Sequence, residues 1–203
     1  METNKTQNLD MARADIYKAV SLLFYQPSDE MGDYLIHLKD CLQELYPELA
    51  PIVDKMQTSL SLAKNDLTQL QVDHAKLFIG PFDVLAIPYS SVYLDGQRQV
   101  MGDSTLKVLE YYQEAGLELS GDINEVPDHI SLELEFMYYV TFKALETGDK
   151  EFIAKRNRFL EEHLGLWVNP FTNFIIERAE TDFYKNLGLI TKEFIGAESK
   201  GLM

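Results

Sequence analysis

Apolar residues recur at three- and four-residue spacing along most of the chain, which is the period of an amphipathic helix. The first such stretch follows Asp10, a residue able to cap a helix, and ends before Pro27. The same spacing predicts three further helices in the first part of the chain: one over 31–45, one from about Pro51, and one capped by Asp66.

The helical period breaks at "GPFDVLAIPYSSVYLDGQRQVMGDS", residues 80–104, where glycines and prolines interrupt the apolar positions. We expect an irregular, partly apolar segment here. A helix is predicted to restart at Asp103 or Ser104 and to end at Gly116, and "GLELSGDINEVP" follows as a connection.

The most informative helix is predicted from Asp128 to about Gly148, because its apolar residues cover most of its circumference. Such a helix belongs in the middle of a bundle. Two more helices are predicted after it, one containing Phe152 and one opened by "NPF" at Pro170, where proline suits a first helical turn. Trp167, just before that turn, is predicted to be core.

These patterns predict an all-α fold: a single globular helical bundle of about nine to ten helices. We divide this single domain into an N-terminal half over 1–115, a connection over 116–127 and a C-terminal half over 128–203. No repeat of 20 to 50 residues is visible, which argues against a regular helical solenoid.

The composition is that of a soluble globular protein, with 46% hydrophobic and 25% charged residues. Cys41 is the single cysteine, so an intramolecular disulfide is excluded and a reducing compartment is favoured. We expect its thiol to be buried or half-buried. The sequence shows neither a secretory signal nor a run of about eighteen apolar residues. We therefore expect a cytoplasmic protein without membrane insertion.

The charge is strongly acidic, with 33 acids against 18 bases and a net charge of −15. This balance disfavours nucleic acid as a partner and favours a basic one. Residues 108–142 contain no Lys or Arg, and this window can be a solvated acidic face or a dock for a cationic peptide. Its acids are Glu110, Glu114, Glu118, Asp122, Glu125, Asp128, Glu133 and Glu135.

The stretch "EVPDHISLELEFM" places Asp128 and His129 side by side at a helix start. A hydrolytic dyad needs a nucleophile, and Ser90 and Ser91 lack the strand-turn-helix context of a nucleophile elbow. A metal site could use His129 and Glu133, which share a helix face, but a simple i, i+4 interaction between them is the alternative. Asp128 has a structural interpretation as the cap of its own helix.

Four stretches together resemble the TorD/DmsD group of redox-enzyme maturation chaperones, to which NarJ-type proteins are more distantly similar. They are "LFIGPFDVLAIPYSSVYLD", "EVPDHISLELEFMYYV", "FLEEHLGLWVNPF" and "FYKNLGLI", and the likeness extends over residues 73–190. The resemblance implies an all-helical cytoplasmic protein that is not an enzyme. It also implies that the protein binds the twin-arginine signal peptide of a molybdenum-cofactor oxidoreductase precursor and holds it for cofactor insertion before export.

The resemblance also implies a peptide-binding site. Glu125 and Asp128 would pair with the two arginines, and His129 would link the helix start to the groove, with a pKa near neutrality through which its charge could modulate binding. Tyr89 stands where the family often has Trp, a change that keeps an aromatic wall but can alter peptide preference. The other predicted site residues are Phe78, Phe82, Pro88, Ser91 and Tyr93.

Several alternatives stay open. A NarJ-type assembly chaperone would bind a precursor terminus without needing the two arginines, and a small helical His/Asp or metal-dependent hydrolase is a more distant candidate. No phosphate-binding loop is present, and we assign no cofactor, metal or catalytic residue. We expect a monomer, with a helix-exchanged homodimer hinged at 116–127 as the alternative.

Overall fold

The computed structural model describes residues 2–63, 66–80, 83–96, 100–118 and 125–202. Over these ranges the chain forms ten α-helices and two π-helical segments and contains no strand, which confirms the all-α prediction. The helices are α1 (Glu2–Leu23), α2 (Met31–Leu45), α3 (Ala50–Leu62), α4 (Thr68–His74), α5 (Ser90–Leu94), α6 (Asp103–Glu114), α7 (Ile130–Thr147), α8 (Lys150–Phe159), α9 (Gly165–Arg178) and α10 (Asp182–Lys200), and the π-helical segments are η1 (Ala75–Ile79) and η2 (Leu160–Leu164).

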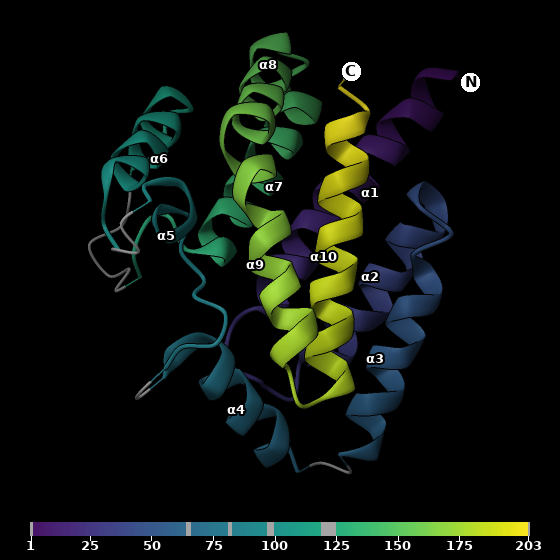
Figure 1. Ribbon diagram of the computed structural model, residues 1–203. Coiled ribbons are helices and arrows are strands. Elements are labelled where there is room, and N and C mark those ends of the chain that lie inside the picture. Colours follow the sequence, from purple (N-terminus) through teal and green to yellow (C-terminus); the bar gives the residue numbers. More distant parts are fainter. Residues whose placement is uncertain (1, 64–65, 81–82, 97–99, 119–124, 203) are drawn as a thin grey trace.

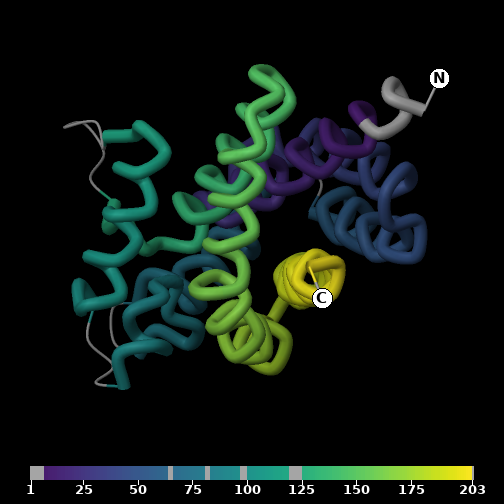
Figure 2. Tube along the Cα trace, turned by 90° about the horizontal axis from the view of Figure 1, so that it is seen from above, coloured from purple at the N-terminus to yellow at the C-terminus, as the bar shows by residue number. Residues whose placement is uncertain are grey.

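Helix α10 lies near the middle of the molecule and packs against α9 and α3, while α1 packs against α7 and α2 (Figure 1). Helices α5 and α6 lie on one side and α2 and α3 on the other, as the view from above also shows (Figure 2). One cluster of buried apolar side chains draws on early helices and late ones, including Ile16, Leu35, Trp167 and Phe194.

Helix α7 matches its prediction closely. It begins at Ile130 and ends at Thr147, and the capping residue Gly148 has a φ of 69°, the left-handed conformation that glycine adopts without a steric penalty. Its side chains from Ile130 to Thr141 are mostly buried, as expected for a helix that is apolar nearly all round.

Two predicted helix starts are wrong. Asp10 lies inside α1, which begins at Glu2, and its carboxylate pairs with Arg13 one turn later rather than capping the helix. Pro170 does not open a helix but lies inside α9. Its missing N–H frees the carbonyl of Leu166, which lies on the exposed side of α9, where water can satisfy it. The periodicity also made no prediction over α10.

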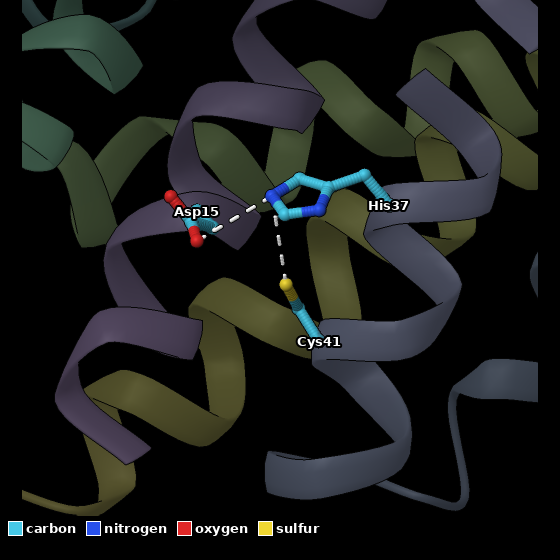
Figure 3. A group of neighbouring side chains, drawn as sticks. All are labelled: Asp15, His37 and Cys41. Atoms are coloured by element: carbon cyan, nitrogen blue, oxygen red, sulfur yellow. Dashed lines mark hydrogen bonds and ion pairs between the residues drawn. The ribbon is translucent and has the colours of Figure 1, made fainter. Parts of the chain in front are cut away.

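Cys41 lies at the contact between α1 and α2 and is 7% exposed, which confirms the prediction of a buried thiol. The Nε2 atom of His37, one turn earlier on α2, is 3.8 Å from Cys41 Sγ and 3.4 Å from Asp15 Oδ2 on α1 (Figure 3). Burial and, to a smaller extent, the nearby carboxylate of Asp15 raise the pKa of the Cys41 thiol to about 11.

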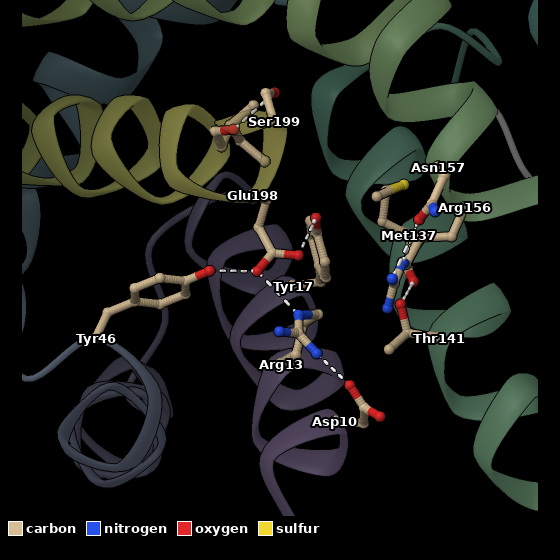
Figure 4. A network of polar contacts seen from close by, with 11 residues as sticks. Asp10, Arg13, Tyr17, Tyr46, Met137, Thr141, Arg156, Asn157, Glu198 and Ser199 are labelled. Atoms are coloured by element: carbon tan, nitrogen blue, oxygen red, sulfur yellow. Dashed lines mark hydrogen bonds and ion pairs between the residues drawn. The ribbon is translucent and has the colours of Figure 1, made fainter. Parts of the chain in front are cut away.

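A second polar cluster joins α10 to α1 and α2. Glu198 on α10 accepts hydrogen bonds from Arg13 Nε at 2.9 Å, from the Tyr17 hydroxyl at 3.3 Å, and from the hydroxyl of Tyr46, the residue that follows α2 (Figure 4). The Glu198 side chain is only 6% exposed, so burial removes most of its hydration. The three donors replace the hydrogen bonds to water that the carboxylate loses. The cluster therefore positions the end of α10.

Two glycines of α10 test the packing against α9. A Cβ at Gly188 would lie 3.1 Å from two carbons of the buried Ile175, whereas a Cβ at Gly196 would meet nothing within 4 Å. We expect Gly188→Ala to be less stable than Gly196→Ala by about 1–3 kcal/mol, because overpacking opposes the gain in helix propensity only at Gly188. Urea unfolding of both variants measures the difference, and equal stability would contradict this packing.

Candidate functional site

The two stretches singled out by the sequence meet in space. Segment 88–90 pairs in an antiparallel manner with segment 128–130 at the start of α7, which couples the irregular part of the chain to the central helix. We call this meeting point, residues 88–91 with 125–130, the junction. The backbone pairing comprises Ser90 N to Asp128 O at 3.0 Å, Ile130 N to Pro88 O at 2.9 Å, and Tyr89 opposite His129.

Asp128 caps a helix, but not the predicted one. Its carboxylate is fully buried, and Oδ2 accepts a hydrogen bond from the backbone N–H of Ser91 at 2.9 Å, at the start of α5. The cap of α7 is His129, whose Nδ1 accepts from Ser131 N at 3.2 Å. Because Asp128 lies one residue before that cap, its side chain is free to serve α5 instead.

His129 is buried against the ring of Tyr89, with the two ring centroids 5.3 Å apart in an edge-to-face arrangement. Burial lowers the pKa of His129 to about 4, although the carboxylates of Glu125 and Asp128 oppose that shift. The imidazole is therefore neutral at pH 7, and the expectation of a pKa near neutrality is wrong. The neutral ring can still accept the hydrogen bond that caps α7.

Glu125 is the partly exposed carboxylate of the junction. Its Oε1 accepts hydrogen bonds from the Tyr89 hydroxyl at 2.9 Å and from Val126 N at 3.0 Å. Burial and the hydrogen bond to Glu125 both raise the pKa of Tyr89, so its hydroxyl stays protonated and donating. The structure thus places a carboxylate directly beside an aromatic ring at the molecular surface.

Tyr93 lies one turn into α5 and is half-buried. Its ring stacks on Trp167 of α9 with a centroid distance of 5.5 Å and an interplanar angle of 29°. It also contacts Phe171 and Phe174, so the aromatic contacts next to the junction continue onto α9. Trp167 itself is fully buried, as predicted.

The remaining predicted residues are placed differently. Phe78 is 6% exposed and packs on Phe24, Phe171 and Tyr184, so it is a core residue, and the prediction that it lines a groove is wrong. Its position in η1, on the inner side of the bundle, explains the difference. Phe82 lies outside the described residues. Pro88 and Ser91 are buried and act through their backbone atoms.

Glu133 does not pair with His129, which contradicts both the metal pair and the i, i+4 side-chain interaction. It is fully buried and accepts a hydrogen bond from Trp167 Nε1 at 2.9 Å, while its other oxygen lies 2.8 Å from Nε2 of the buried His163. The sequence carried a signal for this contact, because an acid inside an apolar run needs a buried partner.

The serine and histidine geometry does not form a nucleophile and base. Ser90 and Ser91 are both fully buried, and the Nδ1 atom of His129 is occupied by a backbone N–H. The Ser90 hydroxyl instead lies 3.5 Å from Asp128 Oδ2, where it supports the cap of α5. The arrangement therefore builds a fixed junction rather than a hydrolytic dyad.

The base-free acidic window is not one solvated face. Asp128 and Glu133 are fully buried, Glu114 pairs with Arg158, and Glu135 lies 3.1 Å from Lys18 Nζ. Asp122 lies outside the described residues, as does the 119–124 part of the predicted connection.

Sequence reasoning missed a cavity beside the junction, because its lining comes from separate segments. The cavity has a volume of about 310 Å³ and adjoins the junction through Tyr112, whose hydroxyl donates to the carbonyl of Pro127 at 2.9 Å. Its apolar wall contains Leu117, Leu132, Phe136, Tyr138 and Tyr139, and its charged rim contains Lys18, Glu118 and Glu135.

Burial is the main cause that raises the pKa of Tyr25 to about 12, and the charges of Glu135 and Glu125 raise it further.

Comparison with known proteins gives a consistent family. The family model for the nitrate reductase delta subunit matches residues 42–173. The chaperone protein TorD of Aliivibrio salmonicida is 26% identical over 89% of this chain and 90% of its own length. The Tat proofreading chaperone DmsD of Salmonella typhimurium is 28% identical over 85% of this chain and 81% of its own.

A solved structure supports the fold. A candidate redox enzyme maturation protein from Archaeoglobus fulgidus superposes with a TM-score of 0.53, at 24% identity, and 93% of each chain is covered. Within the described ranges, none of the helices has both the length and the apolar character that crossing a membrane requires.

The neutral, buried His129 gives the fold a specific pH dependence. Because its pKa falls from about 6.5 in the unfolded chain to about 4 in the fold, the unfolded state binds the extra proton first as pH falls. The stabilisation is complete above pH 6.5 and is lost towards pH 4. Between pH 7 and pH 5 this single group lowers the free energy of unfolding by about 2 kcal/mol.

His129→Asn keeps a capping acceptor but cannot titrate, so it should lose about 2 kcal/mol less than the wild type over that interval. Urea unfolding at pH 8, 7, 6 and 5 measures the two curves, which should run parallel above pH 7. Parallel curves down to pH 5 would show that the ring titrates as in the unfolded chain. An NMR titration of the ring gives the pKa directly.

Proposed function

The chain belongs to the nitrate reductase delta subunit family, and on this premise we propose that it is a maturation chaperone for a molybdenum-cofactor oxidoreductase. It binds the twin-arginine signal peptide of the precursor and holds the precursor for cofactor insertion before export. The names of the TorD and DmsD relatives support the chaperone role, and that of DmsD supports the link to twin-arginine export.

The observation that carries this proposal is the pairing of Glu125 with Tyr89 at the surface of the junction. A twin-arginine peptide presents two guanidinium groups followed by an apolar stretch, so its receptor needs carboxylates beside apolar surface. Glu125 offers a carboxylate fixed in place by two donors, and the Tyr89 ring provides the adjoining aromatic wall.

The two predicted acids take different roles in this proposal. Glu125 is half-buried and can receive a guanidinium, whereas Asp128 is fully buried and already accepts from Ser91 N. Asp128 is therefore a positioning residue, which holds segment 88–91 against α7 so that Tyr89 reaches Glu125. The second arginine is proposed to bind Glu135. There it would compete with the partly exposed Lys18, which already pairs with Glu135.

The apolar part of the peptide is proposed to enter the cavity beside the junction. Its volume of about 310 Å³ is enough for one or two large apolar side chains, and Leu132 and Phe136 form its inner wall. In this proposal the acidic rim at Glu118 and Glu135 receives the basic end of the same peptide. Its support is that the charged rim and the apolar wall line one cavity.

This role places the chain in the cytoplasm, where a precursor must be held before export, and a monomer is the state in which we expect it to act. Light scattering after size-exclusion chromatography distinguishes the monomer from a helix-exchanged dimer.

Glu125→Gln should weaken binding of a synthetic twin-arginine signal peptide by about 10- to 100-fold, because a charge-assisted hydrogen bond contributes about 1.5–3 kcal/mol. Isothermal titration calorimetry with the full chain measures the affinity. Glu110→Gln is the matched control, since this exposed acid belongs to the same base-free window but lies on α6 outside the cavity lining. It should bind like the wild type.

Equal losses of affinity in both variants would show that only the overall negative charge matters. No loss of affinity in Glu125→Gln would show that Glu125 does not bind the peptide. Circular dichroism melting of each variant separates lost binding from lost folding.

The family name itself favours one alternative, a NarJ-type assembly chaperone that binds a precursor terminus without the two arginines. Peptides with both arginines changed to glutamine distinguish the two. For a twin-arginine receptor, we expect the double change to weaken binding to the wild type at least as much as Glu125→Gln does, and to have little further effect in that variant. Binding that ignores the arginines would establish the NarJ-type mode.

A further inference from the structure

The contact between α1 and α2 brings together three side chains that commonly ligate metals. Asp15 comes from α1, and His37 and Cys41 are one turn apart on the facing side of α2 (Figure 3). One ligand atom from each lies within 4.8 Å of the other two. We propose that Asp15, His37 and Cys41 form a binding site for a divalent transition-metal ion, with Zn²⁺ as the ion that fits best.

Two of the three ligand separations are close to those around a tetrahedral ion, and the third is within 4.8 Å. Bonds of about 2.0 Å from Zn²⁺ to nitrogen and oxygen and about 2.3 Å to sulfur place N and O about 3.3 Å apart and N and S about 3.6 Å apart. The observed separations are 3.4 Å between His37 Nε2 and Asp15 Oδ2, and 3.8 Å between His37 Nε2 and Cys41 Sγ. The same ring nitrogen faces both partners, as a shared ion requires.

The donor types select the class of ion. One thiol, one imidazole and one carboxylate form the mixed S, N, O set that Zn²⁺ accepts, whereas Mg²⁺ and Ca²⁺ prefer oxygen alone. The three groups line a cavity of about 310 Å³ on the α1–α2 surface. Asp40 and Glu44 line it too, so a fourth ligand can come from an acid or from water.

The surroundings favour a cation over a free thiolate. Three carboxylates, Asp15, Asp40 and Glu44, line the cavity, and among the residues whose side chains the structure describes its lining contains neither Lys nor Arg. A nucleophilic cysteine needs a positive neighbour to hold its thiolate, and this cluster supplies negative ones. A bound Zn²⁺ reverses that field, since the thiol passes its proton to solvent and binds as the thiolate.

The site would cross-link two helices. His37 and Cys41 lie on the same helix, so an ion held by them alone would constrain only α2, but Asp15 extends the link to α1. The junction lies elsewhere, at the start of α7. Metal binding is therefore a property separate from peptide recognition, and either can fail without the other.

The test is a Co²⁺ titration of the full chain, freed of any histidine tag, followed by displacement with Zn²⁺. We expect one Co²⁺ per chain, with a thiolate-to-cobalt charge-transfer band and the intense visible absorption of tetrahedral Co²⁺. Cys41→Ser should abolish the charge-transfer band, and His37→Ala and Asp15→Asn should each weaken Zn²⁺ binding by about tenfold or more.

Asp33→Asn is the matched control, because it removes an exposed acid from the same helix without touching the cavity lining. It should bind like the wild type. Absence of the thiolate band in the wild type, or equal Zn²⁺ affinity in the wild type and Cys41→Ser, would overturn the proposal and leave an ordinary His37–Asp15 ion pair. X-ray absorption of the wild-type Zn²⁺ complex, which needs no variant to fold, must show a sulfur at about 2.3 Å.

Discussion

A carboxylate buried in an apolar helix must find hydrogen-bond donors, and two such carboxylates near the start of α7 determine where its neighbours lie. Asp128 takes the backbone N–H of Ser91, which holds α5. Glu133 takes the indole N–H of Trp167 and lies against His163, which holds α9 and η2. Leaving a buried polar group without its hydrogen-bond partner costs about 1–3 kcal/mol. The positions of α5, η2 and α9 are therefore tied to where these two carboxyl groups lie.

Trp167 joins the two constraints. Its N–H is engaged by Glu133, which fixes the indole plane, and Tyr93 of α5 stacks on that plane. Helix α5 is consequently held at its start by Asp128 and on its side by Trp167. What remains near the surface is Tyr89 with Glu125. The buried acids organise the junction, and Glu125 stays half-buried, a division that charge counting along the sequence does not show.

Sequence patterns succeeded where one periodicity decided the outcome. Helix α7 was predictable because its apolar residues cover most of its circumference, which is typical of a helix in the middle of a bundle. The patterns failed where the partner came from elsewhere in the chain: periodicity does not say which N–H a carboxylate such as Asp128 will reach. The prediction for Phe78 failed for a related reason, because a phenylalanine is equally suited to a binding groove and to the core. The prediction that Tyr89 and His129 belong to one site came from the family resemblance and not from the spacing of residues in the sequence.

Because His129 is buried and neutral, it adds no positive charge to the junction. Beside Glu125 and Asp128 an exposed imidazole would gain a proton readily and partly neutralise them, and the resulting imidazolium would repel the guanidinium that we propose binds there. Burial reverses this tendency, because the desolvation penalty outweighs the attraction of both acids and lowers the pKa of the ring to about 4. The ring then serves as the cap of α7 without contributing charge. A neutral capping histidine thus lets the protein place a polar group at the helix start without adding positive charge beside Glu125 and Asp128.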